Sequence, residues 1–157
     1  MKRLLTTLLA VGALAASSLT FSASLPMLHS AATGNNYIAY TDLKTYSQAD
    51  SYCNVKQGHL AVINSTSEAN DLKAYLHTTS GTYWLGETLA GYQGTYVTVT
   101  NQAYVFPQGI TETGLPFPGD TSLFYYQFIT SSSGDILNWT IAGGTAYFVC
   151  EFEDAPI

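Results

Sequence analysis

The chain has 157 residues, a length that suits a single domain. All eleven acidic residues lie beyond residue 24, where the strong bases are three lysines, so this part of the chain has a net charge of −8. Such a balance argues against nucleic acid as a partner, since phosphates demand clustered lysine and arginine. It equally argues against electrostatic docking on anionic lipid.

The first 24 residues have the pattern of an export signal. Met1-Lys2-Arg3 carries the positive charge, and an uncharged apolar stretch follows over residues 4–16. A membrane anchor is the alternative, but about 20 apolar residues are needed to span a bilayer and this run is shorter. We therefore expect residues 1–24 to be removed as a signal peptide, leaving no stable membrane span. The product is expected to be secreted or periplasmic.

A first helix is expected after a polar stretch and a short strand. Residues 25–36 are small and polar and predict a flexible lead-in to a domain that covers residues 37–155; residues 37–40 have strand composition. Thr45 and Gln48 have the spacing of a capping box, which starts a helix. We expect Gly58 to end this helix, because glycine readily takes the left-handed conformation of a helix terminus.

A second helix is expected after a buried strand. Residues 60–63 form a short apolar run between turn signals, which is typical of a buried strand. Ser65 and Glu68 form another capping box. The apolar residues that follow recur at helical spacing, which predicts a helix that runs to about His77.

The chain beyond Ser80 lacks helical periodicity and predicts strands and loops. The candidate strands are 82–85, 95–100, 124–129 and 146–152. The stretch 106–122 is rich in proline and glycine, which predicts one long non-regular loop. Two helices followed by strands indicate an α+β domain on one core.

The two cysteines, Cys53 and Cys150, lie near opposite ends of the expected domain. In an oxidising compartment such a pair suggests one disulfide bond, and the alternative is two separate buried thiols. A bridge closing a loop of this length would stabilise the fold by about 4.7 kcal/mol in the loop-entropy model.

Four segments of the sequence resemble C-type lectin domains, in the order that this family shows. Gln48-Ala49 with Cys53, and then Gly58-His59-Leu60-Ala61 with Glu68, are similar to the first half of the family domain. Trp84-Leu85-Gly86 is similar to the family's Trp-Ile-Gly segment, and Tyr147-Phe148-Val149-Cys150-Glu151 resembles its closing strand.

The resemblance implies a C-type-lectin-like fold, with two helices packed on small antiparallel sheets and a long non-regular loop. It implies that Cys150 pairs with Cys53, that Trp84 fills the core, and that Gly86 permits a close backbone approach. His59 falls at a helix-to-strand turn and is interpreted as structural rather than catalytic or metal-binding. The family analogy makes the domain a binding module for a carbohydrate or a protein.

The calcium motifs of the family are missing from this sequence. Many members hold calcium with Glu-Pro-Asn or Gln-Pro-Asp and with Trp-Asn-Asp, whereas this chain has Phe117-Pro118-Gly119 and Trp139-Thr140-Ile141 at the matching positions. Calcium needs six to eight oxygen ligands, and these segments supply too few. We therefore expect no cofactor and no metal ligands. A calcium site with a shifted register, using Asp120 and Asn138, is the alternative.

Six residues of the loop region are the candidate ligand-binding residues: Glu112, Phe117, Asp120, Asp135, Asn138 and Trp139. The alternative interpretation of the carboxylates is that they are solvated side chains in a loop rather than ligand-binding groups. The alternative interpretation of the aromatic residues around 124–128 is that they pack in the core. A surface-assembly component is the second functional hypothesis. A secreted hydrolase is the third and weakest, because no nucleophile–base motif is present, and we expect the chain not to be an enzyme.

Overall fold

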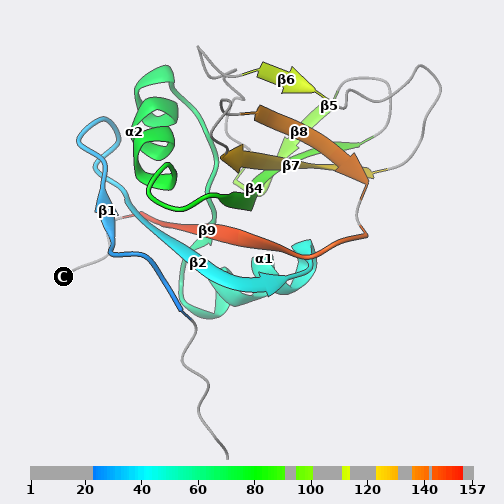
Figure 1. Ribbon diagram of the computed structural model, residues 1–157, viewed down its shortest axis with the longest axis horizontal. Helices are drawn as coiled ribbons and strands as arrows, with labels where there is room; N and C mark the ends of the chain where they lie inside the picture. Colours follow the sequence, from blue (N-terminus) through cyan, green and yellow to red (C-terminus); the bar gives the residue numbers. More distant parts are fainter. Residues whose placement is uncertain are drawn as a thin grey trace, which may run out of the picture.

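The computed structural model describes residues 23–90, 95–100, 111–113, 123–130, 136–141 and 143–153. Within these residues the chain forms two helices and one nine-stranded sheet, drawn in Figure 1. The elements in chain order are β1 (Leu28–His29), β2 (Asn36–Lys44), α1 (Tyr46–Val55), β3 (His59–Leu60), α2 (Thr66–Leu76), β4 (Gly81–Ala90), β5 (Thr95–Thr98), β6 (Thr111–Thr113), β7 (Leu123–Thr130), β8 (Ile136–Ile141) and β9 (Ala146–Phe152). The predicted α+β architecture is confirmed.

The sheet brings the two ends of the domain together. Its strand order is β1-β2-β9-β4-β7-β8-β6, with β3 paired to β9 and β5 paired to β4. Strand β2 runs antiparallel to β9, so the first long strand of the domain lies beside its last strand (Figure 1). Most pairs are antiparallel, whereas β4–β9 and β6–β8 are parallel. Strands β8 and β6 therefore lie at the end of the strand order that is opposite to β1.

Both predicted helix starts are confirmed. The hydroxyl of Thr45 accepts the N–H of Gln48 at 3.4 Å, and the Gln48 side chain accepts the N–H of Thr45 at 3.1 Å, which completes the capping box. At the second helix the hydroxyl of Ser65 accepts the N–H of Glu68 at 3.1 Å. Helix α2 ends at Leu76, one residue before the predicted end.

The expected role of Gly58 at the end of α1 is wrong. The helix ends at Val55, and the residue in the left-handed conformation is Gln57, with a φ of 65°. Gly58 is required for a different reason: a Cβ atom there would collide with the backbone oxygen of Glu151 and with the ring of Phe152. This glycine therefore lets the turn after α1 pack directly against β9.

The segment expected as a lead-in is part of the sheet. Strand β1 lies within residues 25–36, and Leu28 pairs with Tyr37 of β2. The same segment contacts the rest of the domain through Ser30, whose hydroxyl donates to the Asp71 carboxylate at 2.6 Å. Residues 25–36 are thus packed against the domain rather than separate from it.

The other strands agree in part with the prediction. Strand β9 covers the predicted residues, and β4, β5 and β7 overlap their predicted ranges. The run 60–63 is buried, but only Leu60 belongs to β3. Strands β6 and β8 were not predicted, and β6 lies inside the stretch interpreted as a loop, most of which falls outside the described residues.

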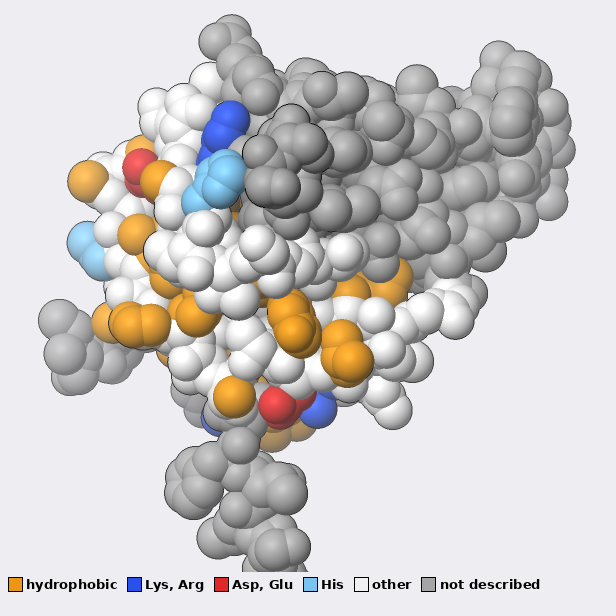
Figure 2. All heavy atoms as spheres, viewed as in Figure 1, with side chains coloured by type: hydrophobic (Ala, Val, Ile, Leu, Met, Phe, Trp, Pro, Cys, Tyr) orange, Lys and Arg blue, Asp and Glu red, His pale blue; other side chains and the backbone are white. Residues whose placement is uncertain are grey.

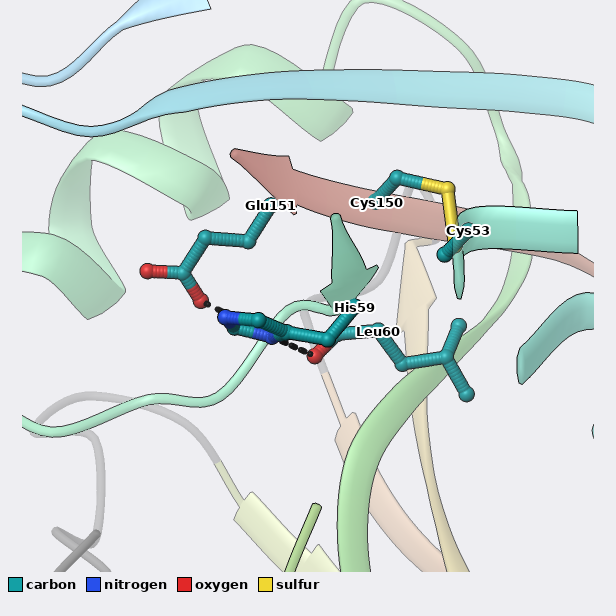
Figure 3. The surroundings of a disulfide bond; sticks show 5 residues. All are labelled: Cys53, His59, Leu60, Cys150 and Glu151. Carbon is teal, nitrogen blue, oxygen red and sulfur yellow. Dashed lines mark hydrogen bonds and ion pairs between the residues drawn. A yellow bond between two sulfur atoms is a disulfide. The ribbon is translucent and has the colours of Figure 1, made fainter. Parts of the chain in front are cut away.

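One of the two hydrophobic clusters of the core contains a disulfide bond between Cys53 of α1 and Cys150 of β9, shown in Figure 3. The Cα atoms of the two cysteines are 5.4 Å apart, and both residues are fully buried. Trp84 is 1% exposed in the same cluster, as expected, and its indole N–H donates to the carbonyl of Lys44 at 2.8 Å. The disulfide and this hydrogen bond both connect the start of the domain to its later strands.

A search of the described residues for a helix suited to crossing a membrane, in length and apolar character, found none.

Candidate functional site

Three of the six predicted ligand-binding residues lie on two neighbouring strands. Glu112 belongs to β6, and Asn138 and Trp139 belong to β8. The two strands are parallel, with Thr113 opposite Asn138 and Glu112 opposite Leu137. Positions that are about 25 residues apart in sequence are therefore adjacent at one end of the sheet. The other three predicted residues, Phe117, Asp120 and Asp135, lie outside the described residues.

Strand β8 is held between β6 and β7. On its β7 side, Asn138 is opposite Gln127 and Trp139 is opposite Tyr126. The aromatic segment of 124–128 is thus a strand that supports β8, and it connects β8 to β4. The pairing fixes the backbone of Asn138 on both sides and that of Trp139 on its β7 side, and a fixed backbone is what a binding site needs to be preorganised.

A second polar feature, which the sequence did not predict, is a set of three buried glutamates. Glu68, Glu87 and Glu151 come from α2, β4 and β9, and they are 0%, 1% and 0% exposed. A carboxylate is costly to bury unless hydrogen bonds satisfy it. Each of these carboxylates therefore needs donors within the protein.

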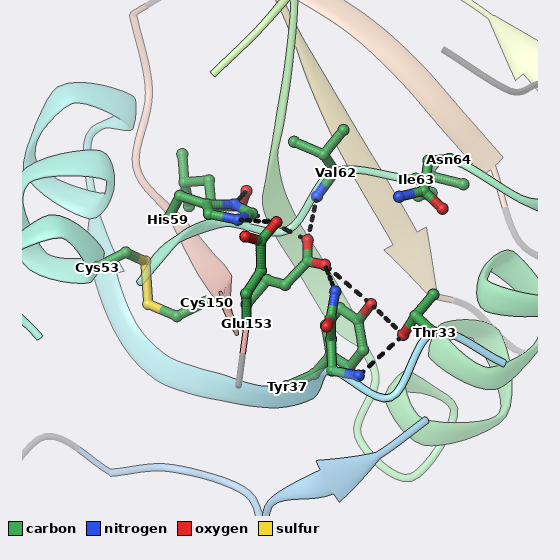
Figure 4. Close-up of polar contacts among 12 residues, drawn as sticks. Thr33, Tyr37, Cys53, His59, Val62, Ile63, Asn64, Cys150 and Glu153 are labelled. Atoms are coloured by element: carbon green, nitrogen blue, oxygen red, sulfur yellow. Dashed lines mark hydrogen bonds and ion pairs between the residues drawn. A yellow bond between two sulfur atoms is a disulfide. The ribbon is translucent and has the colours of Figure 1, made fainter. Parts of the chain in front are cut away.

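The donors come largely from one short segment after β3. Three consecutive N–H groups donate to the three carboxylates, so each glutamate holds one residue of the segment. The pairs are Val62 N to Glu151 Oε2 at 3.0 Å, Ile63 N to Glu87 Oε1 at 2.6 Å, and Asn64 N to Glu68 Oε2 at 2.9 Å. Figure 4 shows the segment of Val62, Ile63 and Asn64, with the hydrogen bond that the Val62 N–H donates to a carboxylate. The connection from β3 to α2 is fixed by this arrangement without belonging to a strand.

Tyr37 and Asn35 complete the set of donors. The Tyr37 hydroxyl donates to Glu68 Oε1 at 2.6 Å and lies 3.1 Å from Glu151 Oε1. The Asn35 amide donates to Glu151 Oε1 at 2.7 Å. These neutral donors supply hydrogen bonds to Glu68 and Glu151, and they do not neutralise the charge of the carboxylates.

Burial without a neutralising charge changes the acidity of the cluster. The pKa of Glu87 is raised to about 8, chiefly by burial; the nearby charges of Glu68 and Glu151 add to the increase, and the Ile63 N–H opposes it. Burial also raises the pKa of Glu68 and of Tyr37. Glu87 Oε2 has no hydrogen-bond partner among the described residues. Burial in this cluster therefore favours the protonated form of Glu87.

His59 lies at the start of β3, at the turn where the sequence places it (Figure 3). Its Nδ1 is 2.8 Å from the carbonyl of Leu60 and 3.8 Å from Glu151 Oε2, and its Nε2 is 3.7 Å from Glu153 Oε1. Since a carbonyl only accepts, the contact with Leu60 requires the proton on Nδ1. In the described part of the chain, no three or more histidine, cysteine, aspartate or glutamate residues are grouped so as to hold a metal ion.

Two capped helices, a sheet that pairs the first and last long strands, and a disulfide from the first helix to the last strand define a C-type-lectin-like domain. The sequence matches the model of the lectin C-type domain over residues 42–152. This span covers most of the chain, and the chain belongs to the C-type lectin domain family.

Solved structures with the same fold include both lectins and an antifreeze protein. The C-type lectin domain of murine dendritic cell inhibitory receptor 2, in complex with an N-glycan, is 20% identical with a TM-score of 0.60, over 76% of this chain and 91% of that one. The calcium-independent C-type lectin SPL-2 from Saxidomus purpuratus is 13% identical with a TM-score of 0.59, over 78% and 88%. A calcium-independent type II antifreeze protein is 17% identical with a TM-score of 0.59, over 74% and 85%.

A search among curated proteins gave no significant match. At these identities the structural likeness establishes the fold, and the ligand has to be argued from the residues of this chain.

Proposed function

We propose that this domain is a calcium-independent lectin that binds a carbohydrate at the β6–β8 end of the sheet. The observation that carries the proposal is the parallel pairing of β6 with β8, which brings the backbone positions of Glu112, Asn138 and Trp139 together. Acidic, amide and aromatic residues are types that recognise sugar hydroxyls and the apolar faces of sugar rings. Phe117, Asp120 and Asp135 are close to these strands in sequence and are included in the proposed site.

Independence of calcium is proposed from the composition of the two motif positions. Phe117-Pro118-Gly119 and Trp139-Thr140-Ile141 lack the flanking carboxylates and amides that calcium prefers. The likeness in fold to SPL-2, whose name describes it as calcium-independent, agrees with this proposal.

The proposal includes an extracytoplasmic location and a purely binding role. The Cys53–Cys150 disulfide is a bond of oxidising compartments, and residues 1–24 have the pattern of an export signal. The sequence carries no nucleophile–base motif, and the proposed ligand is recognised without being cleaved.

A glycan array probed with the purified, disulfide-bonded protein tests the proposal, once with calcium and once with a chelator. We expect the same glycans to bind in both conditions. Binding that disappears with the chelator would overturn calcium independence and would point to Asp120 and Asn138 as ligands in a shifted register. The absence of binding in both conditions would overturn the lectin assignment.

Two variants locate the binding site. Asn138→Ala on β8 and Glu112→Ala on β6 should each weaken binding to an array hit by about tenfold, which is the effect of losing one good hydrogen bond. Asn54→Ala, on the exposed side of α1, is the matched control and should bind like the wild type. If all three variants bind alike, the site lies elsewhere on the domain.

A surface-assembly role is the second candidate, and the place of β6 favours it. Strand β6 is the last strand in the described order, and an edge strand can pair with another chain. Sedimentation of the purified protein separates the two candidates. An assembly component should associate with itself or co-purify with a partner, whereas a lectin that binds free glycans has no need to do so.

A further inference from the structure

A row of uncharged polar residues crosses three neighbouring strands at the β6 end of the sheet. The register pairs Thr113 of β6 with Asn138 of β8, and Asn138 with Gln127 of β7. Residues directly opposite each other on neighbouring strands share a face of the sheet, and successive residues of one strand alternate between the two faces. The three residues therefore occupy one face, in a line that spans two inter-strand spacings, or about 10 Å. We call these three residues the polar row.

The polar row differs from the other rows that cross the same strands. Two neighbouring rows on β6, β8 and β7 each combine one polar or charged residue with two apolar residues: Glu112 with Leu137 and Phe128, and Thr111 with Ile136 and Ile129. Of the six residue pairs that β7 and β8 form in the described part of the chain, Gln127 with Asn138 is the one that joins two amides. Gln127 is also the only amide among residues 123–129, which are otherwise aromatic or aliphatic. Its place opposite Asn138 therefore favours a role other than apolar packing.

The inner neighbours in the same row offer no side-chain partner to the amide of Gln127. Trp84 of β4 lies opposite Gln127 and is 1% exposed, and Phe148 of β9 lies opposite Trp84. The one polar group of a tryptophan side chain is the indole N–H, and that of Trp84 already donates to the carbonyl of Lys44 at 2.8 Å. Phenylalanine has no polar group in its side chain. Within the row, the polar neighbour of Gln127 is therefore Asn138.

Two opposed amides have more hydrogen-bonding groups than they can use on each other. A carboxamide offers two N–H donors and one oxygen with two lone pairs. When each amide donates once to the other, each still has one N–H and one lone pair for a third partner. Adjacent sugar hydroxyls can accept and donate at these groups, whereas a carboxylate or sulfate meets no opposite charge in the row. On the face of the molecule in Figure 2, charged side chains are also sparse among the described residues. The row is thus suited to an uncharged ligand.

We propose that the polar row is the part of the lectin site that contacts the sugar, with Gln127 as a ligand-binding residue that the sequence analysis did not select. The inference rests on the proposed function and names its ligand class, which is an uncharged saccharide held through neighbouring hydroxyl groups. The amides of Gln127 and Asn138 bind two adjacent hydroxyls, and the Thr113 hydroxyl binds a third one farther along the saccharide. Strand β7 is paired with β4 and with β8, so the backbone of Gln127 is fixed before the ligand binds.

Binding of the purified protein to four immobilised polysaccharides tests the ligand class. The probes are mannan, galactan and dextran, which are uncharged, and polygalacturonate, which is carboxylated. We expect at least one uncharged polysaccharide to bind, with an affinity that added salt does not change, because no ion pair is there to be screened. Tighter binding to polygalacturonate than to every uncharged probe would show that the ligand class is wrong, and the lectin assignment would stand. Binding to none of the four would overturn the lectin assignment and the role of the row with it.

A substitution at Gln127 separates ligand binding from a structural role. Gln127→Leu keeps the approximate size of the side chain and removes its donors and its acceptor. It should bind the polysaccharide about tenfold more weakly, which is the effect of losing one good hydrogen bond. Its melting temperature should not fall, because leucine suits a strand of aromatic and aliphatic residues. Asn70→Ala, on the exposed side of α2, is the matched control for the loss of an amide and should bind like the wild type.

The outcomes distinguish the row from the lectin site as a whole. Thr113→Val removes a hydroxyl at nearly the same volume and should also weaken binding, at the outer end of the row. If Gln127→Leu and Thr113→Val bind like the wild type while Asn138→Ala does not, the lectin site stands and the row is not its contact surface. If Gln127→Leu unfolds at a lower temperature and binds normally, the amide is a structural partner of Asn138 within the sheet, and the inference is wrong.

Discussion

Glu68 and Glu151 share the hydroxyl group of Tyr37, which lies 2.6 Å from an oxygen of the first and 3.1 Å from an oxygen of the second. The three residues belong to α2, β9 and β2, which are far apart in sequence. A tyrosine hydroxyl has one proton to donate, so the two buried carboxyl groups share it, in addition to the N–H donors that each has of its own. This hydroxyl therefore ties the second helix to both long strands of the sheet.

Removal of that hydroxyl should destabilise the domain. Tyr37→Phe keeps the ring in the core and leaves both carboxyl groups short of a donor, which should cost about 2 kcal/mol. Urea unfolding followed by tryptophan fluorescence measures the change. Tyr46→Phe, on α1 and outside the carboxylate cluster, is a control for the loss of a tyrosine hydroxyl. A Tyr37→Phe variant as stable as the wild type would show that the shared hydrogen bond contributes nothing.

The stability of the domain should fall as the pH rises through the window set by Glu87. Burial raises the pKa of this carboxyl group from 4.5 to about 8. Below pH 4.5 the group is protonated in both the folded and the unfolded chain. Between pH 4.5 and about 8 the folded chain retains a proton that the unfolded chain has lost, so the free energy of unfolding decreases with pH. The expected decrease across the window is a few kcal/mol.

Glu87→Gln is the variant that isolates this effect. The glutamine oxygen can still accept the N–H of Ile63, and the side chain no longer titrates. Urea unfolding at a series of pH values should give a flatter profile for the variant than for the wild type, because the other titrating groups are common to both. Parallel profiles would show that Glu87 does not titrate in this window.

Reduction of the Cys53–Cys150 disulfide should cost most of the stability of the domain. The bond closes a sequence separation of 97 residues, and the loop-entropy model assigns about 4.7 kcal/mol to a loop near that length. A typical domain is stable by only about 5–15 kcal/mol. Thermal unfolding with and without a reductant, compared with the Cys53→Ala/Cys150→Ala variant, measures the contribution. Equal melting temperatures in all three samples would contradict the prediction.

Gly86→Ala should be strongly destabilising. A Cβ atom at this position would lie 2.5 Å from the backbone oxygen of Leu60 and 2.9 Å from a methyl group of Val62. The N–H of Gly86 also donates to the carbonyl of Ala61 at 2.8 Å, so the two backbones cannot separate without losing that bond. Overpacking of this kind costs about 1–3 kcal/mol. The prediction is checked by thermal unfolding.

Gly144→Ala is the matched control for this glycine. An added Cβ atom at Gly144 would meet no heavy atom within 4 Å, and the residue is exposed. Its melting temperature should stay within about 1 °C of the wild type, as for most surface substitutions. A similar loss of stability in both variants would show that the close approach at Gly86 is not the cause.

Much of the fold could be predicted because its signals are local. Thr45 with Gln48, and Ser65 with Glu68, mark the helix starts within a few residues, and the structure confirms both. Strand β8, in contrast, was not predicted from its own residues. Its partners β6 and β7 come from other parts of the chain, and strand formation depends on pairing and burial more than on composition.

The candidate ligand site could be predicted only as a list of residues. Glu112, Asn138 and Trp139 were chosen from a family resemblance and from the composition of the loop region. Their adjacency follows from the register of β6 on β8, which nothing in either segment specifies alone. For Phe117, Asp120 and Asp135 the prediction stands as it was made, outside the described residues.

The sequence by itself determined the two helices with their caps, the class of fold, and the pair of cysteines that closes it. These properties are carried by residue types at fixed short spacings or by a recognisable order of motifs. Only the tertiary structure decided that Glu68, Glu87 and Glu151 are buried together and that Gln127 lies opposite Asn138. A charged side chain looks the same in sequence whether it is solvated or buried, and packing between distant elements fixes the difference.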